Sequence, residues 1–472
     1  MAFKLPPNSF GIPAAASAED LGAPERLLRA ERMAAVAWGA RRTWFLTGGA
    51  TQGNVAACLA IAQGGTDVVV QRTAHGSTID GLIAAGLAPT FVAPEVDERL
   101  GISHCVTPQA LDRALNATPG AAAAFVVSPT FYGAVADVRG LARVAHGHGA
   151  PLIVDETWGA HLPFSDRLPA PALAAGADLV ITSPQKHLGS LAGSALLHLG
   201  RHAGEWLDEE GIARALGALS STRPSRVLCA SLDEARQRAV RDGPALLYGM
   251  VHALADLRRE ITAIPGLDVQ DERIVGQHGV VGFDPLRLTI DVRGSGAGGD
   301  AWLGALRRAS DVEPAVCEEH VLVVAFELGD DVAAWGERLL TGLHGAHALL
   351  GRRPGRAAPA PVLETAPLAR LTPRDAFLAG REEVPVQDAV GRIAAESLIP
   401  TPPGIPLVLP GEELDATVLL HALRAVRRGT EVRGAADPEL RTVLVVVEPV
   451  ESPGAGPTGA AEVRTGAPRR PT

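Results

Sequence analysis

Short apolar runs alternate with amphipathic stretches through the first half of the chain. Runs of strand length occur at 44–46, 67–70, 90–92, 123–127, 152–154, 179–181 and 194–200, and helical patterns occur at 23–40, 54–62, 108–116 and 138–147. Strands separated by helices of this length favour a parallel, doubly wound α/β sheet with right-handed crossovers. We therefore expect a mostly parallel sheet at the centre of the fold.

The rest of the chain changes character several times. A long helical region follows at 203–264, interrupted near Pro224, and then DPLRLTIDV, AWLGALRRA and HVLVVAFEL give a strand, a helix and a strand. A stretch rich in Pro, Ala and Arg has the composition of a linker. The predicted organisation is an irregular N-terminal segment (1–22), a large domain (23–265), a small α/β domain (266–350), a linker (351–371), a C-terminal α+β domain (372–449) and a disordered tail (450–472).

Two residues follow apolar runs at a place where ligands bind in such folds. Asp155 comes directly after the run at 152–154, and Lys186 lies in the loop after the run at 179–181. The carboxyl ends of parallel strands form the crevice that holds ligands in open α/β sheets. Pyridoxal phosphate requires a lysine for its aldehyde and a carboxylate that keeps its pyridine nitrogen protonated. A surface lysine and a capping aspartate explain the spacing alone equally well.

Two further stretches suit a planar, phosphorylated ligand. A glycine-bearing loop at 48–53 opens the predicted helix at 54–62, and such a loop presents free N–H groups and the positive helix end to an anion. Thr51 and Gln52 add side-chain donors there. His75, after the next apolar run, could stack on a planar ring. A plain helix cap and a solvated histidine are the ordinary alternatives.

The composition argues for a globular protein and against a nucleic-acid binder or a membrane-spanning protein. The chain has 472 residues, 47% of them hydrophobic, which is typical of an ordinary globular protein, and its formal charge of −10 argues against a nucleic-acid binder. No secretory signal and no uncharged apolar run of about 18 residues is found, so no membrane span is expected. Widely spaced cysteines suggest neither disulfides nor a metal site and fit a reducing cytoplasm; they are Cys58, Cys105, Cys229 and Cys317.

Seven separated segments share the order of motifs found in one known family. They are WFLTGGATQGN, RTAHGST, SPTFYG, PLIVDETWGAHL, GADLVITSPQKHLGSLAGSALLH, STRPSRVLCASLD and VGRIAAESLIPTPPGIPLVLPGE, and they cover most of residues 25–415. With these motifs the chain resembles the Orn/Lys/Arg decarboxylases, pyridoxal-phosphate enzymes of the aspartate-aminotransferase (type I) fold. The resemblance implies a short form without the N-terminal wing domain of the large inducible members.

The resemblance also implies roles for residues at matching positions. Lys186 would bind the cofactor aldehyde, Asp155 would pair with the pyridine nitrogen, and His75 would stack on the ring. The remaining cofactor contacts implied are Ala50, Thr51 and Gln52 at the phosphate loop, Ser183 at the phosphate, Thr157 and Trp158 in the pocket wall, and Thr222, which would reach the phosphate of the partner subunit. A homodimer with active sites at its interface follows from the last of these.

The chain departs from the family pattern at several positions. The chain has Thr157 where the family has Ala. It has Gln185 where the family often has His, and His187 where the family has Thr. The N-terminal P-G-H-[KN]-R-G segment corresponds at best to residues 6–11, which lack its histidine and its basic residue, and Thr401 replaces the tyrosine of Y-P-P-G-I-P. These differences lie around the cofactor site and leave the choice of substrate open.

The reaction implied is loss of CO2 from a basic amino acid (lysine, ornithine or arginine), with Lys186, or less readily His187, returning a proton to the α-carbon. An acidic group should then face the distal cation of the substrate; Glu313, Glu396, Glu412 and Glu413 are candidates that could equally be solvated or salt-bridged, and Arg392 could be a structural partner of one of them. Another reaction of the cofactor (transamination, lysis or oxidation) is one alternative, because a fold does not fix a function. A silent regulatory homologue is the other.

Overall fold

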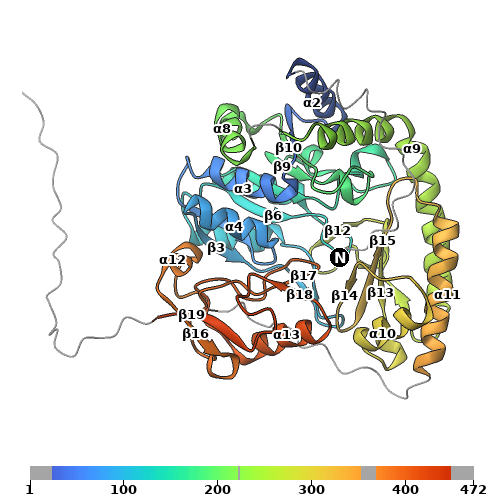
Figure 1. The fold of residues 1–472 in the computed structure, drawn as a ribbon. Helices are drawn as coiled ribbons and strands as arrows, with labels where there is room; N and C mark the ends of the chain where they lie inside the picture. Colours follow the sequence, from blue (N-terminus) through green and yellow to red (C-terminus); the bar gives the residue numbers. More distant parts are fainter. Residues whose placement is uncertain (1–23, 222–223, 352–367, 448–472) are drawn as a thin grey trace, which may run out of the picture.

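The computed structural model describes residues 24–221, 224–351 and 368–447. At its centre lies a seven-stranded sheet of order β1-β10-β9-β8-β6-β2-β3, in which β9, β8, β6, β2 and β3 run parallel and β10 is antiparallel to both of its neighbours (Figure 1). The strands are β1 (Arg42–Leu46), β2 (Asp67–Gln71), β3 (Ala88–Val92), β6 (Ala124–Val127), β8 (Leu152–Glu156), β9 (Leu179–Thr182) and β10 (Ala195–Leu199). The predicted mostly parallel α/β sheet is confirmed.

Alternate residues of the central strands feed two hydrophobic layers. Val70, Ile153 and Ile181 pack under α3, α4 and α8, whereas Val126 and Val154 pack under α5, α6 and α7 on the opposite face. Since successive strand side chains point to opposite faces, a strand covered on both sides must be apolar throughout. The helices of this unit are α2 (Pro24–Trp38), α3 (Gly49–Ile61), α4 (Gly76–Ala85), α5 (Pro108–Ala117), α6 (Val138–Gly147), α7 (Ala172–Ala175) and α8 (Glu209–Leu219).

Helix α3 begins earlier than its sequence predicts. The pattern placed a loop at 48–53 and the first helical residue near Asn54, but the helix starts at Gly49, which has a positive φ of 69°. Gln52 stabilises this start, because its side-chain Oε1 accepts the Gly48 N–H at 2.9 Å. The glycines therefore make a tight turn from β1 directly into the helix rather than a separate loop.

A second unit is built on an antiparallel sheet of order β11-β13-β15-β14. Its elements are α9 (Arg226–Thr262), β11 (Asp268–Val269), β13 (Arg287–Asp291), α10 (Gly299–Ala309), β14 (Val316–Cys317), β15 (Val321–Ala325) and α11 (Val332–Leu350). Strand β12 (Val280–Phe283) instead pairs with β7 (Ala134–Ala136) of the large unit; the domain limits themselves stay predictions. Within the described ranges, no helix is both long and apolar enough to cross a membrane.

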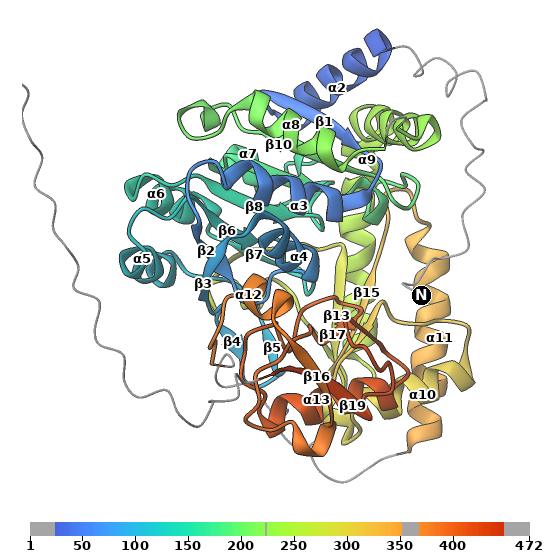
Figure 2. The same cartoon turned by 60° about the vertical axis from the view of Figure 1, so that its left-hand side comes forward.

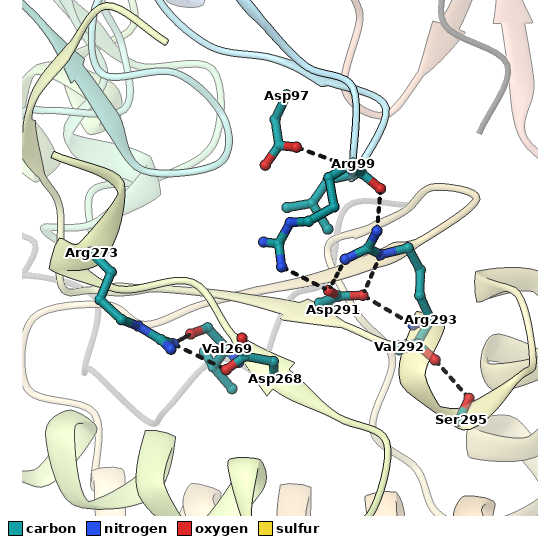
Figure 3. A network of polar contacts seen from close by, with 10 residues as sticks. Asp97, Arg99, Asp268, Val269, Arg273, Asp291, Val292, Arg293 and Ser295 are labelled. Carbon is teal, nitrogen blue, oxygen red and sulfur yellow. Dashed lines mark hydrogen bonds and ion pairs between the residues drawn. The ribbon is translucent and has the colours of Figure 1, made fainter. Parts of the chain in front are cut away.

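A polar network joins the turn of a short hairpin of the large unit to this second sheet. The hairpin consists of β4 (Val96–Asp97) and β5 (Ile102–Ser103). Figure 3 shows the Arg293 guanidinium pointing both at the Asp291 carboxylate, 2.7 Å away, and at the backbone oxygen of Arg99. The Arg99 side chain lies 3.8 Å from the same carboxylate. These contacts fix the large unit against the second sheet.

The C-terminal unit folds against α4 and against the second unit (Figures 1 and 2). It contains α12 (Pro373–Leu378), β16 (Arg381–Pro385), β17 (Ile399–Thr401), α13 (Ala416–Arg427), β18 (Glu431–Arg433) and β19 (Thr442–Val446), with β16 paired to β19 and β17 to β18. A buried ion pair between Arg72 and Glu412, 2.9 Å apart, links it to the large unit. Arg72 also donates to the backbone oxygens of Pro406 and Leu407.

We expect Glu412→Ala to lower the free energy of unfolding by about 3 kcal/mol, because it leaves the buried guanidinium of Arg72 without its counter-charge. Glu413→Ala is the matched control, since Glu413 pairs with Arg370 at an exposed position and should change stability by less than about 1 kcal/mol. Urea unfolding of both variants measures the difference. Equal decreases in the free energy of unfolding for the two variants would show that the buried ion pair does not hold the units together.

Candidate active site

The structure brings Lys186 and Asp155 to neighbouring positions at the carboxyl edge of the parallel sheet. Asp155 lies near the end of β8, and Lys186 ends a short 3-10 helix (Pro184–Lys186) that follows the adjacent strand β9. The Lys186 ammonium nitrogen lies 3.5 Å from the centre of the Trp158 ring. Burial lowers the pKa of Lys186 from 10.5 to about 7, while Asp155 opposes this effect and Arg287 adds to it. The amine is therefore available in its neutral, nucleophilic form near neutral pH.

The Asp155 carboxylate is buried and held by two donors. The side-chain amide of Asn54 donates to Oδ2 at 3.1 Å, and the backbone N–H of Thr157 donates to Oδ1 at 3.0 Å. Asn54, on α3, also donates to the Ser77 hydroxyl at 2.9 Å. The orientation of the carboxylate is thus fixed. A group that pairs with one atom of a planar ligand must be held in this way.

His75 lies at the start of α4, where its Nδ1 accepts the backbone N–H of Ser77 at 3.1 Å. Burial lowers the pKa of His75 to about 4, although Asp155 opposes this shift. The ring is therefore neutral near pH 7, and the hydrogen bond to Nδ1 places its proton on Nε2. A neutral, fixed imidazole near both Asp155 and Lys186 suits contact with a flat ring; its stacking role stays a prediction.

The residues predicted for the phosphate lie around the first turn of α3. Thr51 is exposed in the single chain and Ala50 is half-buried, whereas Gln52 uses its side chain within the protein, on Gly48 and on the Ser220 hydroxyl. Thr222 lies outside the described residues. Ser183 is fully buried, and its hydroxyl has no partner within the described part of the chain. An unpartnered hydroxyl and a helix N-terminus fit a phosphate, so these residues are compatible with the cofactor.

Arg287 is a feature of the site that the sequence pattern did not reveal. It is fully buried on β13, and its guanidinium carbon lies 4.1 Å from the centre of the Trp158 ring. None of its three side-chain nitrogens has a hydrogen-bond partner among the described residues. An arginine in the alternating run DPLRLTID carries no local signal of function, because only the fold brings it to Trp158 and Lys186. Asn54 was missed for the same reason.

Behind Trp158 lies a buried group of His161, His187 and Asp284, whose ligand atoms are within 4.8 Å of one another. No metal site was expected, and these residues are also bound to each other and to the backbone. His161 contacts Asp284 at 3.1 Å, and His187 Nδ1 contacts the Phe326 oxygen at 2.8 Å. Arg287 already places a positive charge beside them. Burial and Arg287 hold the pKa of His187 well below its usual range, and His161, His187 and Arg287 lower the pKa of Asp284 despite its burial. The group therefore suits a structural network better than a cation.

The four acidic residues considered for the substrate's distal cation are all engaged within the chain. Glu313 pairs with Arg307, Glu412 with Arg72, and Glu413 with Arg370, while Glu396 accepts the backbone N–H groups of Ala436 and Leu444. Arg392 pairs with Glu382, so it is a structural partner of a different glutamate from the four. The alternative of salt-bridged carboxylates therefore describes Glu313, Glu412 and Glu413, whereas Glu396 is held by backbone donors.

The lowered pKa of Lys186 predicts how cofactor capture depends on pH. Only the neutral amine attacks an aldehyde, so the rate for apoprotein and pyridoxal phosphate should rise up to about pH 7 and level off above it. Arg287→Met removes a cation that depresses the pKa, and the inflection should move to higher pH. Arg273→Met, at an exposed position, is the control. Stopped-flow absorbance measures these rates; an inflection near 10 in the unmodified protein would contradict the account.

Comparisons with known proteins agree with this geometry. Residues 14–294 match the family model described as Orn/Lys/Arg decarboxylase, major domain, and residues 360–432 match its C-terminal domain. The arginine decarboxylase of Bacillus subtilis is 31% identical over 432 residues, which are 91% of this chain and 87% of that protein. The arginine decarboxylase of Halalkalibacterium halodurans is 32% identical over 445 residues, which again cover 91% of this chain and 87% of that protein.

Solved structures show the same fold. The constitutive lysine decarboxylase of E. coli superimposes with a TM-score of 0.71 at 20% identity, covering 92% of this chain and 74% of that one. The pyridoxamine-pyruvate aminotransferase of Mesorhizobium loti gives a TM-score of 0.53 at 18% identity over 72% of this chain and 89% of that one. The fold is that of the type I pyridoxal-phosphate enzymes, and the cofactor of the matched family is pyridoxal phosphate. The chain belongs to the Orn/Lys/Arg decarboxylase family.

Proposed function

We propose that this member of a family of basic amino acid decarboxylases acts on arginine. The reaction type is supported by the Lys186 amine, which lies over Trp158 and within the electrostatic field of Asp155. The choice of arginine is supported by the relatives named arginine decarboxylase, which are 31 to 32% identical over 91% of the chain. A relative named lysine decarboxylase, from Pseudomonas aeruginosa, is 24% identical.

Pyridoxal phosphate, when bound, withdraws electrons from the substrate's α-carbon, so that a bond to this carbon can break. Lys186 would hold its aldehyde end and Asp155 its pyridine nitrogen, with His75 on the ring face. The phosphate would lie at the start of α3 near Ser183, Ala50, Thr51 and Gln52, and the walls would be Thr157 and Trp158. These side chains fix the reacting atoms, which lowers the barrier by orientation and preorganised charge.

Arg287 would bind the substrate carboxylate. Its guanidinium is buried beside Trp158 and lacks a partner among the described residues, so a carboxylate there satisfies an otherwise costly group. The aromatic ring of Phe131, 4.7 Å from that of Trp158, helps to exclude water from this side, which favours loss of the charged group as CO2. Lys186 Nζ would return the proton to the α-carbon; His187 is less suited, since its Nδ1 is bound to Phe326.

The assembly that we propose is a homodimer with the active sites at its interface, in the cytoplasm. Helix α2 exposes Leu28, Met33 and Val36, and the phosphate-binding turn exposes Thr51 in the single chain. All four cysteines are free thiols, as a reducing compartment requires. Sedimentation of the holoprotein at twice the mass of one chain is the expected result, and a stable, active monomer would refute the dimer.

A product screen tests the function. Purified holoprotein is incubated with arginine, lysine, ornithine or norleucine, and amine, CO2, keto acid and peroxide are measured. We expect amine and CO2, with kcat/KM for arginine at least about tenfold above that for lysine. Keto acid or peroxide as the main product would favour another reaction of the cofactor. A preference for lysine or ornithine would overturn the choice of arginine.

A further inference from the structure

A cavity of about 240 Å³ lies where the three units of the protein meet. Its lining comes from the segments after β2 and β3, from residues 400–407 of the C-terminal unit, from the end of β14 and from α13. Figure 1 shows β14, β17 and α13 in this region. Because β2 and β3 are parallel strands, the cavity opens at the same carboxyl edge of the sheet that holds Asp155 and Lys186, where ligands bind in such folds.

The cavity contains a carboxylate that the protein itself does not neutralise. Glu318 lines it, and among the described residues its carboxylate accepts no hydrogen bond and is influenced only by the charges of Arg428, Asp300 and Glu319. The neighbouring guanidinium of Arg428 is already shared by Asp300, at 2.6 Å, and Glu319, at 2.7 Å. Burial raises the pKa of Glu318 to about 7, and Arg428 opposes this shift only in part. A cation bound there would supply the missing charge.

The other cation in the lining is also occupied. Arg72 is bound to Glu412 and to two backbone oxygens, so it does not offset Glu318. Much of the remaining wall is apolar, including Ile102, Pro402 and Ile405. An apolar passage with one free carboxylate suits an aliphatic chain that ends in an ammonium or guanidinium group.

The cavity lies next to the cofactor-binding residues. Its lining residue Thr73 precedes His75 by two positions, and Gly404, between two lining residues, packs against the His75 ring. The Gly76 N–H donates to the Gly404 oxygen at 2.9 Å, and a Cβ on Gly404 would lie only 2.5 Å from His75 Nε2. Tyr132, another lining residue, is next in sequence to Phe131, whose ring lies 4.7 Å from that of Trp158. The cavity therefore borders both the His75 loop and the aromatic wall that contacts Lys186.

We propose that this cavity receives the cationic end of the substrate side chain and that Glu318 is the carboxylate that selects it. The inference rests on the proposed function for the identity of the substrate, but binding of the cation can be measured separately. Glu318 takes the role for which Glu313, Glu396, Glu412 and Glu413 are excluded by their own partners. Sequence alone does not distinguish it from Glu319, which is bound to Arg428.

The test compares Glu318→Gln, which keeps the shape of the side chain, with Glu319→Gln, which removes a charge one residue away. Calorimetry measures the Kd of holoprotein for agmatine, the amine that arginine yields on decarboxylation, and steady-state kinetics give KM and kcat for arginine. For Glu318→Gln both Kd and KM should rise about 10- to 100-fold with kcat nearly unchanged, the effect of losing a charged hydrogen bond. For Glu319→Gln the Kd for agmatine and the KM for arginine should both stay within about threefold of the values of the unmodified protein.

Visible absorbance of the bound cofactor and thermal unfolding confirm that each variant is intact. Wild-type values of Kd and KM in Glu318→Gln overturn the inference, as does a fall in kcat without a change in binding. A third outcome is that no basic amino acid is decarboxylated, yet agmatine binds tightly and only Glu318→Gln abolishes this binding. In that case the proposed function fails and the assignment of the cavity stands. Decarboxylation of arginine with no effect of Glu318→Gln gives the opposite result, and the cavity assignment alone fails.

Discussion

Replacing Lys186 with alanine should lower kcat at least about 10⁴-fold, because the same amine binds the cofactor covalently and transfers the proton to the α-carbon. The chain contains only two lysines, Lys4 and Lys186, which makes the test unusually clean. Borohydride reduction of holoprotein followed by peptide mass spectrometry should place the cofactor on Lys186. The Lys186→Ala variant should retain no covalent cofactor after reduction.

Lys4→Ala is the control for this experiment and should keep both activity and labelling. Lys4 lies outside the described part of the chain, and Lys186 is the one lysine among the described residues. Label on Lys4 in the unmodified protein, or full activity of Lys186→Ala, would contradict the assignment of the lysine.

Asp155→Asn should reduce kcat by about 10³-fold, the size of effect found when a preorganised charge in a water-excluded site is removed. The substitution keeps the shape of the side chain but removes the negative charge that would hold a proton on the pyridine nitrogen. Cofactor affinity should fall as well, and both quantities follow from titration of apoprotein with pyridoxal phosphate and from steady-state kinetics.

Glu156→Gln is the matched control, one residue along the same strand and equally buried. Burial raises the pKa of Glu156 to about 8, so this group is mostly protonated at pH 7 and its replacement removes little charge. We expect its activity to stay within about threefold of the unmodified protein. Similar losses for both variants would mean that Asp155 acts only through packing of β8.

The central sheet was predictable because its strands are covered by helices on both faces and therefore read as nearly continuous apolar runs. The positions of Asp155 and Lys186 at strand ends followed from the same pattern. The early start of α3 was not predictable from it, since the glycines that normally break a helix here form the turn that begins one. Gln52 completes this start through a side-chain hydrogen bond that no periodicity reveals.

Residues around the cofactor site were less predictable, because their roles depend on contacts between distant segments. Glu412 and Glu413 are adjacent in sequence, yet one is buried against Arg72 and the other forms an exposed pair. Arg287 and Asn54 reach the site from a strand and a helix whose patterns concern packing alone. Local sequence fixes secondary structure, whereas the balance of charges in a site is set only when the chain is folded.

Release of the carboxyl carbon from arginine follows the proposed reaction itself. Purified holoprotein is given arginine labelled at the carboxyl carbon, and labelled CO2 and agmatine are measured together. Both products should be released in equimolar amounts, and both should be absent with Lys186→Ala. Label that remains in an amino acid or a keto acid, with no agmatine formed, would contradict the proposed reaction.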